Sequence, residues 1–587
     1  MFQLNAFRAC LVLAACTFYS TCIAQYYLRG DIKDANAQPV SGATIYLFSK
    51  GTIPFTSGNS GGFGIPTPLA VDTITITKYG FETLKIPVET KLYQRLVLKP
   101  ISAANTAGKY RLNSFIKSVN TQDKPTYFDN GESYNQIVDN PFLSTKQFPE
   151  TGFGVTVDRA AYSNIRRFIN MKNRVPPDAV RVEEMLNYFS ANNNLYDSST
   201  EFQLRSELLT TPWVSSNVLL YLQVQAPKLD VAAVTPSNFV FLIDVSGSMD
   251  KPNRLPLVQS GLKLLTKNLR DKDSVSIVVY GGDVGVLLHP TSGGNKEKII
   301  DAIEQLVPGG ATPGEAALRT AYKLASSTFI PNGNNRIILA TDGDFNVGQT
   351  TEKELEDLII AQRNKGIYLT CLGVGMGNYK DSKLEALAKS GNGNFAYLDN
   401  LKEAEKVLVT EFTKTLYAVA NDAFINVVFN PQTVANYRLI GFDNNVEALK
   451  DSAAKLEGGE VGTGHTLTAI FELELANTAA KNSVQKLGDV KLQYQLPNST
   501  EKRSLTQRVE HAATAFYSGQ APNQLATVVA MFGGLLRNNP FMKTKYTWDE
   551  LWVLAQKVTN SADPLQAELV VLIEKAKKLY AANRTGK

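Results

Sequence analysis

The sequence has few histidines, few cysteines and no long hydrophobic run beyond its amino terminus. Its 587 residues include three histidines, His289, His465 and His511, which lie far apart along the chain. Zinc sites and histidine-based proton relays need such side chains close together, so both kinds of site are disfavoured. Lys and Arg exceed Asp and Glu by only 60 to 55, a formal charge of +5. This small excess does not have the clustered basic charge of a nucleic-acid-binding protein, so no nucleic-acid partner is expected.

Cysteine is concentrated at the start of the chain. Of the four cysteines, Cys10, Cys16 and Cys22 fall within the first 22 residues, and only Cys371 lies beyond them. If the amino terminus is removed by processing, one cysteine remains. Disulfides within the mature chain are then excluded as the source of its stability.

The amino terminus has the pattern of a secretory signal peptide. One positive charge in residues 1–8 precedes an apolar stretch over 9–19, and small residues follow up to Ala24. We expect a signal peptide over residues 1–24, with export to the periplasm or cell surface. The alternative is a lipoprotein signal ending at Cys16, which would make the protein an outer-membrane lipoprotein anchored there. No later run reaches the roughly 20 apolar residues of a transmembrane helix, so none is expected in the mature chain.

The first part of the exported chain predicts a β-sandwich. Strand-like segments at 44–48, 73–78 and 95–98 are separated by Gly, Pro and Asn residues. We place this sandwich at residues 25–100. The polar stretch that follows, rich in Asn, Ser, Thr and Lys, is predicted to be a linker over residues 101–135.

The rest of the chain predicts a multidomain arrangement around an α/β domain. Residues 236–418 alternate apolar runs with amphipathic helices, the pattern of a doubly wound, mostly parallel sheet covered on both faces. Residues 136–235 form a flank of helices and strands, and residues 419–587 contain strands followed by a helical C-terminal segment. Because inserted domains need only nearby termini, we predict that strands before Gln225 and after Asp422 pair into one β-sandwich around the inserted α/β domain.

Oxygen-bearing side chains follow the apolar runs of the α/β domain. The first run ends in Asp244, with Ser246 and Ser248 in the next turn, Thr312 follows two glycines, and Asp342 ends a later run. The carboxyl ends of strands in such sheets form ligand sites, so the three loops are expected to meet. Two carboxylates and three hydroxyls suit a hard divalent cation. We expect Mg²⁺ or Mn²⁺, with waters and an open coordination position.

These five residues resemble the metal-ion-dependent adhesion site of the von Willebrand factor type A domain, whose pattern is D-x-S-x-S, then Thr, then Asp. In that family the hydroxyls bind the metal directly, and the aspartates bind it directly or through water. Each short motif alone has an ordinary explanation as a turn or a helix cap. All five positions in the right order favour the metal site Asp244, Ser246, Ser248, Thr312 and Asp342, and the resemblance implies binding rather than catalysis.

Two further resemblances extend beyond this domain. The segments GDIKDANAQPVSGATIYL, SGGFGI and KYGFE between residues 30 and 82 resemble the carboxypeptidase-regulatory-like, transthyretin-type sandwiches, which implies an accessory module. A larger part of the chain resembles the bacterial YfbK-type envelope proteins. The segments that carry this resemblance are NPF at 140–142 and those at 157–189, 332–348, 377–381 and 427–444.

The YfbK-type resemblance has one departure. The family's amino-terminal flank usually carries an acidic D-x-D pair, where this chain has Thr156 and Asp158. No second metal site is therefore expected in the flank, and Asp158 is expected to have a structural role, such as that of a helix cap. Tyr379, Lys380 and Asp381 are interpreted as an ordinary exposed loop, with the rim of the ligand surface as the alternative.

Enzyme patterns are incomplete at the same positions. A phosphatase of the haloacid dehalogenase type needs D-x-D, but position 246 is serine, and Ser246 does not lie in a G-x-S-x-G nucleophile elbow. The glycine pairs at 281–282 and 309–310 lack the Gly-Lys-Ser/Thr of a P-loop. We therefore expect a non-enzymatic protein.

The predicted function is an exported, metal-dependent interaction or adhesion protein that binds an acidic side chain of a protein partner. One alternative is an envelope assembly scaffold in which the metal loops are structural. A less favoured alternative is a metal-dependent hydrolase, since the open coordination position could also activate water.

Overall fold

The computed structural model divides the chain into two compact units, residues 1–108 and 109–587. The structure describes the following residues: 26–34, 37–51, 53–58, 60–78, 81, 83–99, 111–113, 126–129, 132–190, 201–229, 234–310, 314–343, 352–377, 379–411, 417–442, 459–477, 482–497, 499, 501–542 and 544–581. The predicted signal peptide, with Cys16, lies outside them. Within the described residues, no helix is long and apolar enough to cross a membrane.

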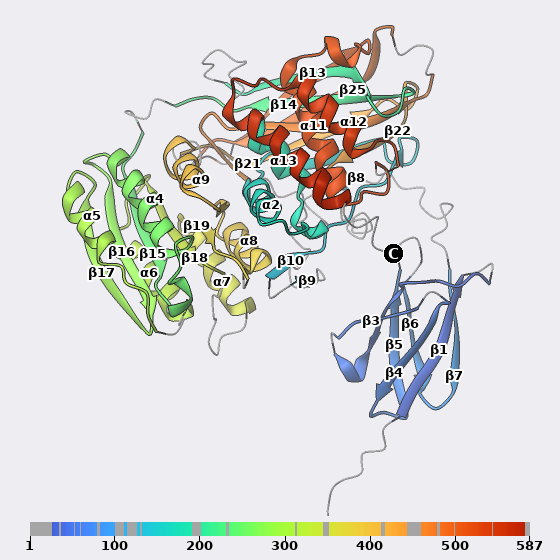
Figure 1. The fold of residues 1–587 in the computed structure, drawn as a ribbon, viewed down its shortest axis with the longest axis horizontal. Helices are drawn as coiled ribbons and strands as arrows, with labels where there is room; N and C mark the ends of the chain where they lie inside the picture. The colour runs from blue at the N-terminus through green and yellow to red at the C-terminus, as the bar shows by residue number, and fades with distance from the viewer. Residues whose placement is uncertain are drawn as a thin grey trace, which may run out of the picture. The chain divides into compact units, whose positions relative to one another are not determined.

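The first unit consists of two sheets that share one apolar core (Figure 1). One sheet has the order β4 (Gly62–Thr67), β1 (Tyr26–Asp34), β7 (Tyr93–Leu98), and the other β3 (Phe55–Thr56), β2 (Thr44–Leu47), β5 (Val71–Thr77), β6 (Leu84–Glu89). Alternate residues, such as Leu28 and Ile32 of β1, point inward because side chains alternate along a strand. The predicted strands at 44–48, 73–78 and 95–98 are confirmed; the carboxypeptidase-regulatory-like assignment stays a prediction.

The α/β domain of the second unit contains a six-stranded sheet. Its order is β17 (Asp283–Ser292), β16 (Ser274–Gly281), β15 (Ser237–Asp244), β18 (Asn334–Thr341), β19 (Ile367–Val374), β20 (Phe395–Leu398). All neighbouring pairs are parallel except β16 with the edge strand β17. Strand order reverses at β15, so a crevice at its carboxyl end is the expected ligand position.

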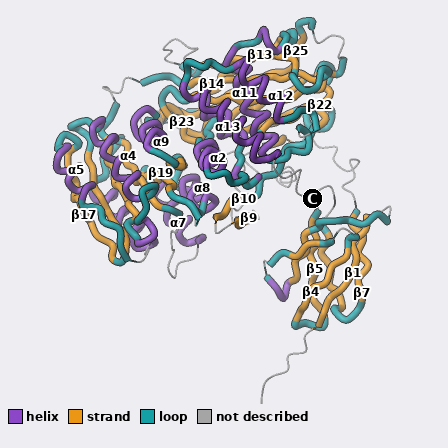
Figure 2. Tube along the Cα trace, viewed as in Figure 1, coloured by secondary structure: helices purple, strands orange, loops and turns teal. Residues whose placement is uncertain are grey.

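Helices cover both faces of this sheet, as the alternation predicted (Figure 2). They are α4 (Leu255–Asn268), α5 (Lys296–Glu304), α6 (Gly314–Ser327), α7 (Glu352–Arg363), α8 (Asp381–Ser390) and α9 (Leu401–Glu405). In β15, Phe239, Phe241 and Ile243 face the core with α4, α5 and α9, whereas Val240 and Leu242 face the core with α6, α7 and α8. Burial on both faces explains why the strand reads as one continuous apolar run.

The segments on either side of the α/β domain form two shared sheets. One has the order β11 (Leu143–Ser144), β22 (Val434–Ile440), β24 (Thr466–Leu475), β14 (Asn217–Gln225), β13 (Gln203–Thr210). The other has the order β26 (Lys502–His511), β25 (Gln485–Gln495), β21 (Ala418–Phe429), β12 (Glu150–Gly154), β8 (Arg111–Asn113), with β23 (Gly459–Gly462) paired to β21. β14 pairs with β24, and β12 with β21. The predicted pairing of strands before and after the α/β domain is thus confirmed.

Five helices share one apolar core with the outer face of the five-stranded sheet. They are α2 (Ala160–Asn170), α3 (Val182–Ser190), α11 (Ala521–Leu536), α12 (Trp548–Val558) and α13 (Pro564–Ala581). Leu219 and Tyr221 of β14 join the helical core, whereas Leu220 and Leu222 join the core between the two sheets. In Figure 1 the teal helix α2 therefore lies with the red helices from the carboxyl terminus. The predicted helical C-terminal segment is confirmed.

Residues 101–135, predicted to be a linker, include three strands within the part that the structure describes. β8 pairs in parallel with β12, and β10 (Glu132–Asn135) pairs with β9 (Thr126–Asp129). Glu132 and Tyr134 are buried. Their polar character suggested a solvated segment, but ion pairing and hydrogen bonding let a charged residue enter the interior.

Candidate metal centre

Two predicted site residues lie at the carboxyl ends of adjacent strands. Asp244 ends β15, and Asp342 follows β18, which pairs with β15 up to Ile243 opposite Ala340. Both carboxylates are buried, with 0% and 1% exposure. The hydroxyl of Thr341 donates a hydrogen bond to Oδ2 of Asp244 at 2.8 Å. The parallel register therefore brings the two aspartates to one edge of the sheet.

The serines of the first loop converge in front of Asp244. The backbone N–H of Ser246 donates to Oδ1 of Asp244 at 2.9 Å, and Ser246 Oγ lies 3.1 Å from Ser248 Oγ. A short 3-10 turn over Gly247–Met249 presents Ser248, which is exposed. The carboxylate is thus at the base of the loop and a hydroxyl is at its open side.

Glycine pairs hold the second loop against the first. Gly310 has φ +79°, and a Cβ there would lie 2.4 Å from the carbonyl oxygen of Gly281. The N–H of Gly309 donates to Val245 O at 2.6 Å, and that of Gly247 donates to Gly310 O at 3.2 Å. The glycines are therefore required for close backbone contact. Thr312, just beyond this anchored backbone, lies outside the described residues, and its metal role stays a prediction.

Arg254 is a site residue that the sequence did not indicate. Its side chain, 4% exposed, forms an ion pair with Asp342 through Nη1 and Oδ2. Nη1 also donates to Ser248 O at 2.5 Å, and Nη2 donates to Met376 O at 2.7 Å. Arg254 immediately precedes α4 and belongs to no pattern with the five predicted residues. Only the folded chain brings its guanidinium to the site.

The electrostatics of the site suit a cation. Burial raises the pKa of Asp244 to about 6, against hydrogen bonds from Ser246 and Thr341 that lower it, and the charge of Asp342 raises it further. A cation beside this carboxylate would relieve the unfavourable burial of its charge. Among the described residues, no group of three or more His, Cys, Asp or Glu side chains could hold a metal. Hydroxyl donors would therefore have to complete the set, as hard oxygen-preferring cations allow.

Two predictions about residues outside the metal site are wrong. Asp158 has the expected structural role but not as a cap of α2, whose N-cap is Arg159; its Oδ1 accepts a hydrogen bond from the N–H of Phe395 at 2.8 Å. Tyr379 and Asp381 are not in an exposed loop, because both are 0% exposed. Asp381 pairs with Arg181 at 2.5 Å, so the flank covers the start of α8.

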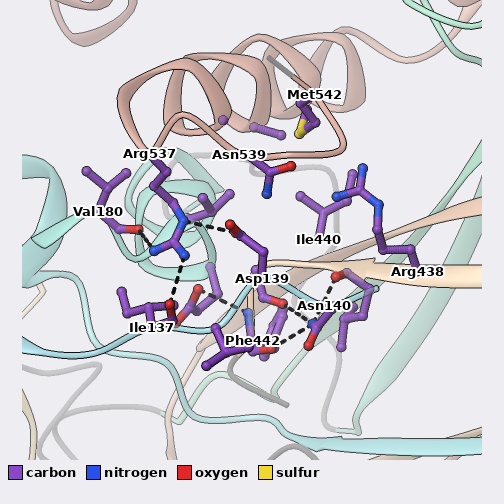
Figure 3. Close-up of a pocket in the computed structure, with 17 residues that line it drawn as sticks. Ile137, Asp139, Asn140, Val180, Arg438, Ile440, Phe442, Arg537, Asn539 and Met542 are labelled. Atoms are coloured by element: carbon purple, nitrogen blue, oxygen red, sulfur yellow. Dashed lines mark hydrogen bonds and ion pairs between the residues drawn. The ribbon is translucent and has the colours of Figure 1, made fainter. Parts of the chain in front are cut away.

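The NPF segment has a structural role near a small pocket at the base of α11 (Figure 3). Nδ2 of Asn140 donates to the carbonyl oxygens of Leu439, Gly441 and Phe442, at 3.0, 2.9 and 2.8 Å. Beside it, Nε of Arg537 lies 3.1 Å from Asp139. Asn140 therefore terminates β22 and ties it to the flank.

Three family models match successive parts of the chain. A family model described as von Willebrand factor type A domain matches residues 238–410. Another, described as Uncharacterized protein YfbK, C-terminal, matches residues 414–579, and a third, described as von Willebrand factor, matches 128–221. The protein named Uncharacterized protein YfbK from Escherichia coli (strain K12) is 37% identical over 474 residues, covering 76% of this chain and 80% of that protein. The chain belongs to the YfbK family.

Other relatives match the YfbK-family chain over shorter regions. Inter-alpha-trypsin inhibitor heavy chain H2 from Sus scrofa is 27% identical over 203 residues, or 33% of this chain and 21% of that protein. A solved structure, von Willebrand factor type A from Catenulispora acidiphila, has a TM-score of 0.35 and 15% identity, and covers 63% of this chain and 93% of that chain. The von Willebrand factor type A domain of this YfbK-family protein indicates a role in protein interaction or adhesion.

Proposed function

We propose that this YfbK-family protein is a non-enzymatic, exported interaction protein that captures an acidic group of a protein partner through a bound Mg²⁺ or Mn²⁺. Asp244, Ser246, Ser248, Thr312 and Asp342 would hold the ion. The observation that carries the proposal is the buried carboxylate of Asp244, with the hydroxyls of Ser246 and Ser248 only 3.1 Å apart on its open side. Export follows from the amino-terminal pattern, and sequencing the amino terminus of the mature protein tests it.

Some residues around Asp244 fix its orientation, and another leaves the site accessible to a partner. Thr341 and the backbone of Ser246 each bond one carboxylate oxygen of Asp244, which fixes its orientation. Ser248 is exposed, so a partner side chain can approach from that side. When bound, the ion would supply an open coordination position for a carboxylate of the partner. Fixed ligands reduce the ordering cost of binding.

Titration calorimetry of the mature protein with Mg²⁺ tests the proposal. We expect binding in the wild type and its loss in Asp244→Ala and Ser246→Ala, with the far-ultraviolet circular dichroism unchanged. Asp283→Ala is the matched control, because Asp283 is an exposed carboxylate in the same domain. Partner capture from envelope extracts should require Mg²⁺ and fail in EDTA. Unchanged Mg²⁺ binding in both site variants would refute the proposal.

A second candidate is an assembly scaffold whose metal loops are structural. It is favoured by the ion pair of Arg254 with the 1% exposed Asp342, which neutralises one site carboxylate without a metal. In that case partner capture persists in EDTA and in Asp244→Ala. The same capture experiment therefore separates the two functions.

A further inference from the structure

Arg254 joins three loops at the carboxyl edge of the sheet. From the residue before α4, its guanidinium reaches the carbonyl oxygen of Ser248, the carboxylate of Asp342 and the carbonyl oxygen of Met376. These groups belong to the loops that follow β15, β18 and β19. The side chain is 4% exposed and is held by three groups, so it loses little further conformational freedom when the site binds a ligand.

A glycine leaves space for the side chain of Arg254. Gly375 has φ +80°, and a Cβ there would lie 2.5 Å from Nε of Arg254. Any larger residue would therefore displace the arginine. Beyond Met376, the N–H of Gly377 donates to Oε1 of Glu132 at 2.9 Å. Glu132, in β10, pairs with Arg167 of the flank at 2.7 Å. The flank is therefore linked through Glu132 to the loop that contacts Arg254.

Without a metal, two carboxylates and one guanidinium lie at this edge of the sheet. Asp244 and Asp342 are both buried carboxylates, and among the described residues the ion pair of Arg254 is with Asp342. A divalent ion held by the site residues would attract the carboxylate of Asp342, which the guanidinium already pairs with. Two cations that share one carboxylate in a poorly solvated site repel each other. A guanidinium at this position would therefore weaken the site's attraction for a metal.

We infer that Arg254 is a built-in cation that competes with the divalent ion for Asp342 and so sets the metal affinity of the site. The inference rests on the proposed function, since it concerns the same ion. It makes the metal-free site a stable state rather than a pair of uncompensated carboxylates. Metal binding then exchanges one cation for another at Asp342, and the affinity stays low enough to respond to the available Mg²⁺.

Calorimetry with Mg²⁺ on Arg254 variants of the mature protein tests the inference. Arg254→Gln should bind Mg²⁺ roughly tenfold more tightly than the wild type, or about 1.4 kcal/mol, because the competing charge is gone. Arg254→Met, which keeps an unbranched side chain, should show the same gain in Mg²⁺ affinity. It serves as the test if Arg254→Gln does not fold. Arg254→Lys retains the charge, and its affinity should stay within about threefold of the wild type.

A second readout is thermal stability without and with Mg²⁺. The uncharged variants should unfold at a lower temperature than the wild type in EDTA, and Mg²⁺ should raise that temperature by more than it does in the wild type. Arg270→Gln is the matched control, because it breaks another Arg–Asp pair, with Asp273 at 2.6 Å, before β16. Its Mg²⁺ affinity should equal that of the wild type.

The outcomes separate this inference from the proposed function. If neither the wild type nor any Arg254 variant binds Mg²⁺, both ideas fail. If Asp244→Ala abolishes binding but the uncharged Arg254 variants bind Mg²⁺ no more tightly than the wild type, only the competition is overturned. A tenfold gain in Arg254→Lys would also overturn it, since the charge would then not be the cause.

Discussion

Replacing Asp158 by asparagine should stabilise the protein at neutral pH and leave it unchanged in acid. Asp158 lies just before α2 and accepts its hydrogen bond from the N–H of Phe395 in β20. Burial raises its pKa from 3.8 to about 6, and the charge of Glu385 adds to this effect. The hydrogen bond from Phe395 and the charges of Arg181 and Lys389 act in the opposite direction.

The pKa shift gives the sign and size of the expected effect. The folded protein holds a proton on Asp158 between about pH 4 and 6, where the unfolded chain has lost it, so this residue's contribution to stability is lost as the pH rises through 6. A pKa of about 6 against 3.8 corresponds to about 3 kcal/mol. Asparagine mimics the protonated acid and still offers an oxygen to Phe395. The variant should therefore gain up to about 3 kcal/mol over the wild type between pH 4 and pH 7.5.

Urea unfolding at a series of pH values, followed by tryptophan fluorescence, measures this difference. The three tryptophans, Trp213, Trp548 and Trp552, all pack against the helical core of the flanks, so the signal reports the region that contains α2. Asp489→Asn, at an exposed carboxylate of the same unit, is the control and should show no such pH dependence. If the difference between Asp158→Asn and the wild type is the same at every pH, the reasoning from buried charge is wrong.

Two further substitutions test the loops and the shared core. Gly343→Ala should destabilise the α/β domain by about 1–3 kcal/mol and weaken Mg²⁺ binding, because φ is +94° and the new Cβ would lie 2.4 Å from the N atom of Lys380. Thermal unfolding and calorimetry check this against Gly285→Ala, where a Cβ meets nothing within 4 Å. Phe471→Ala should cost about 3–5 kcal/mol, since its ring lies 5.3 Å from that of Phe429 in the opposite sheet. Urea unfolding followed by tryptophan fluorescence measures the loss, and an unchanged midpoint would contradict a core shared by the two sheets.

Much of the candidate site followed from strand ends. The apolar runs before Asp244 and Asp342 identified parallel strands, and parallel strands place their carboxyl ends at one edge. Arg254 could not be found in this way. Its role depends on the path of its side chain beneath Gly375 to Asp342, and no spacing in the sequence encodes that contact.

The helices and strands were predictable where the pattern of buried residues is visible as a pattern of apolar residues in the sequence. β15 is buried on both faces and reads as an apolar run, and the helices of the carboxyl terminus have an apolar stripe. The edge strand β17 and the outer strand β26 were not predicted, because both are largely solvent-accessible and carry a weak apolar pattern. Tyr379 and Asp381 were misread as an exposed loop for a related reason: polar residues in a short segment look solvated until another segment covers them.

The sequence by itself determined the α/β alternation, the order of the oxygen donors and the division of the flanks around the inserted domain. These properties depend on local periodicity and on the order of residues along the chain. Tertiary structure alone decided which charges meet. The pairs of Arg254 with Asp342, Arg181 with Asp381 and Arg167 with Glu132 each join separate segments. An ion pair depends on the distance between two atoms after folding, and that distance is set by the packing of every element between them.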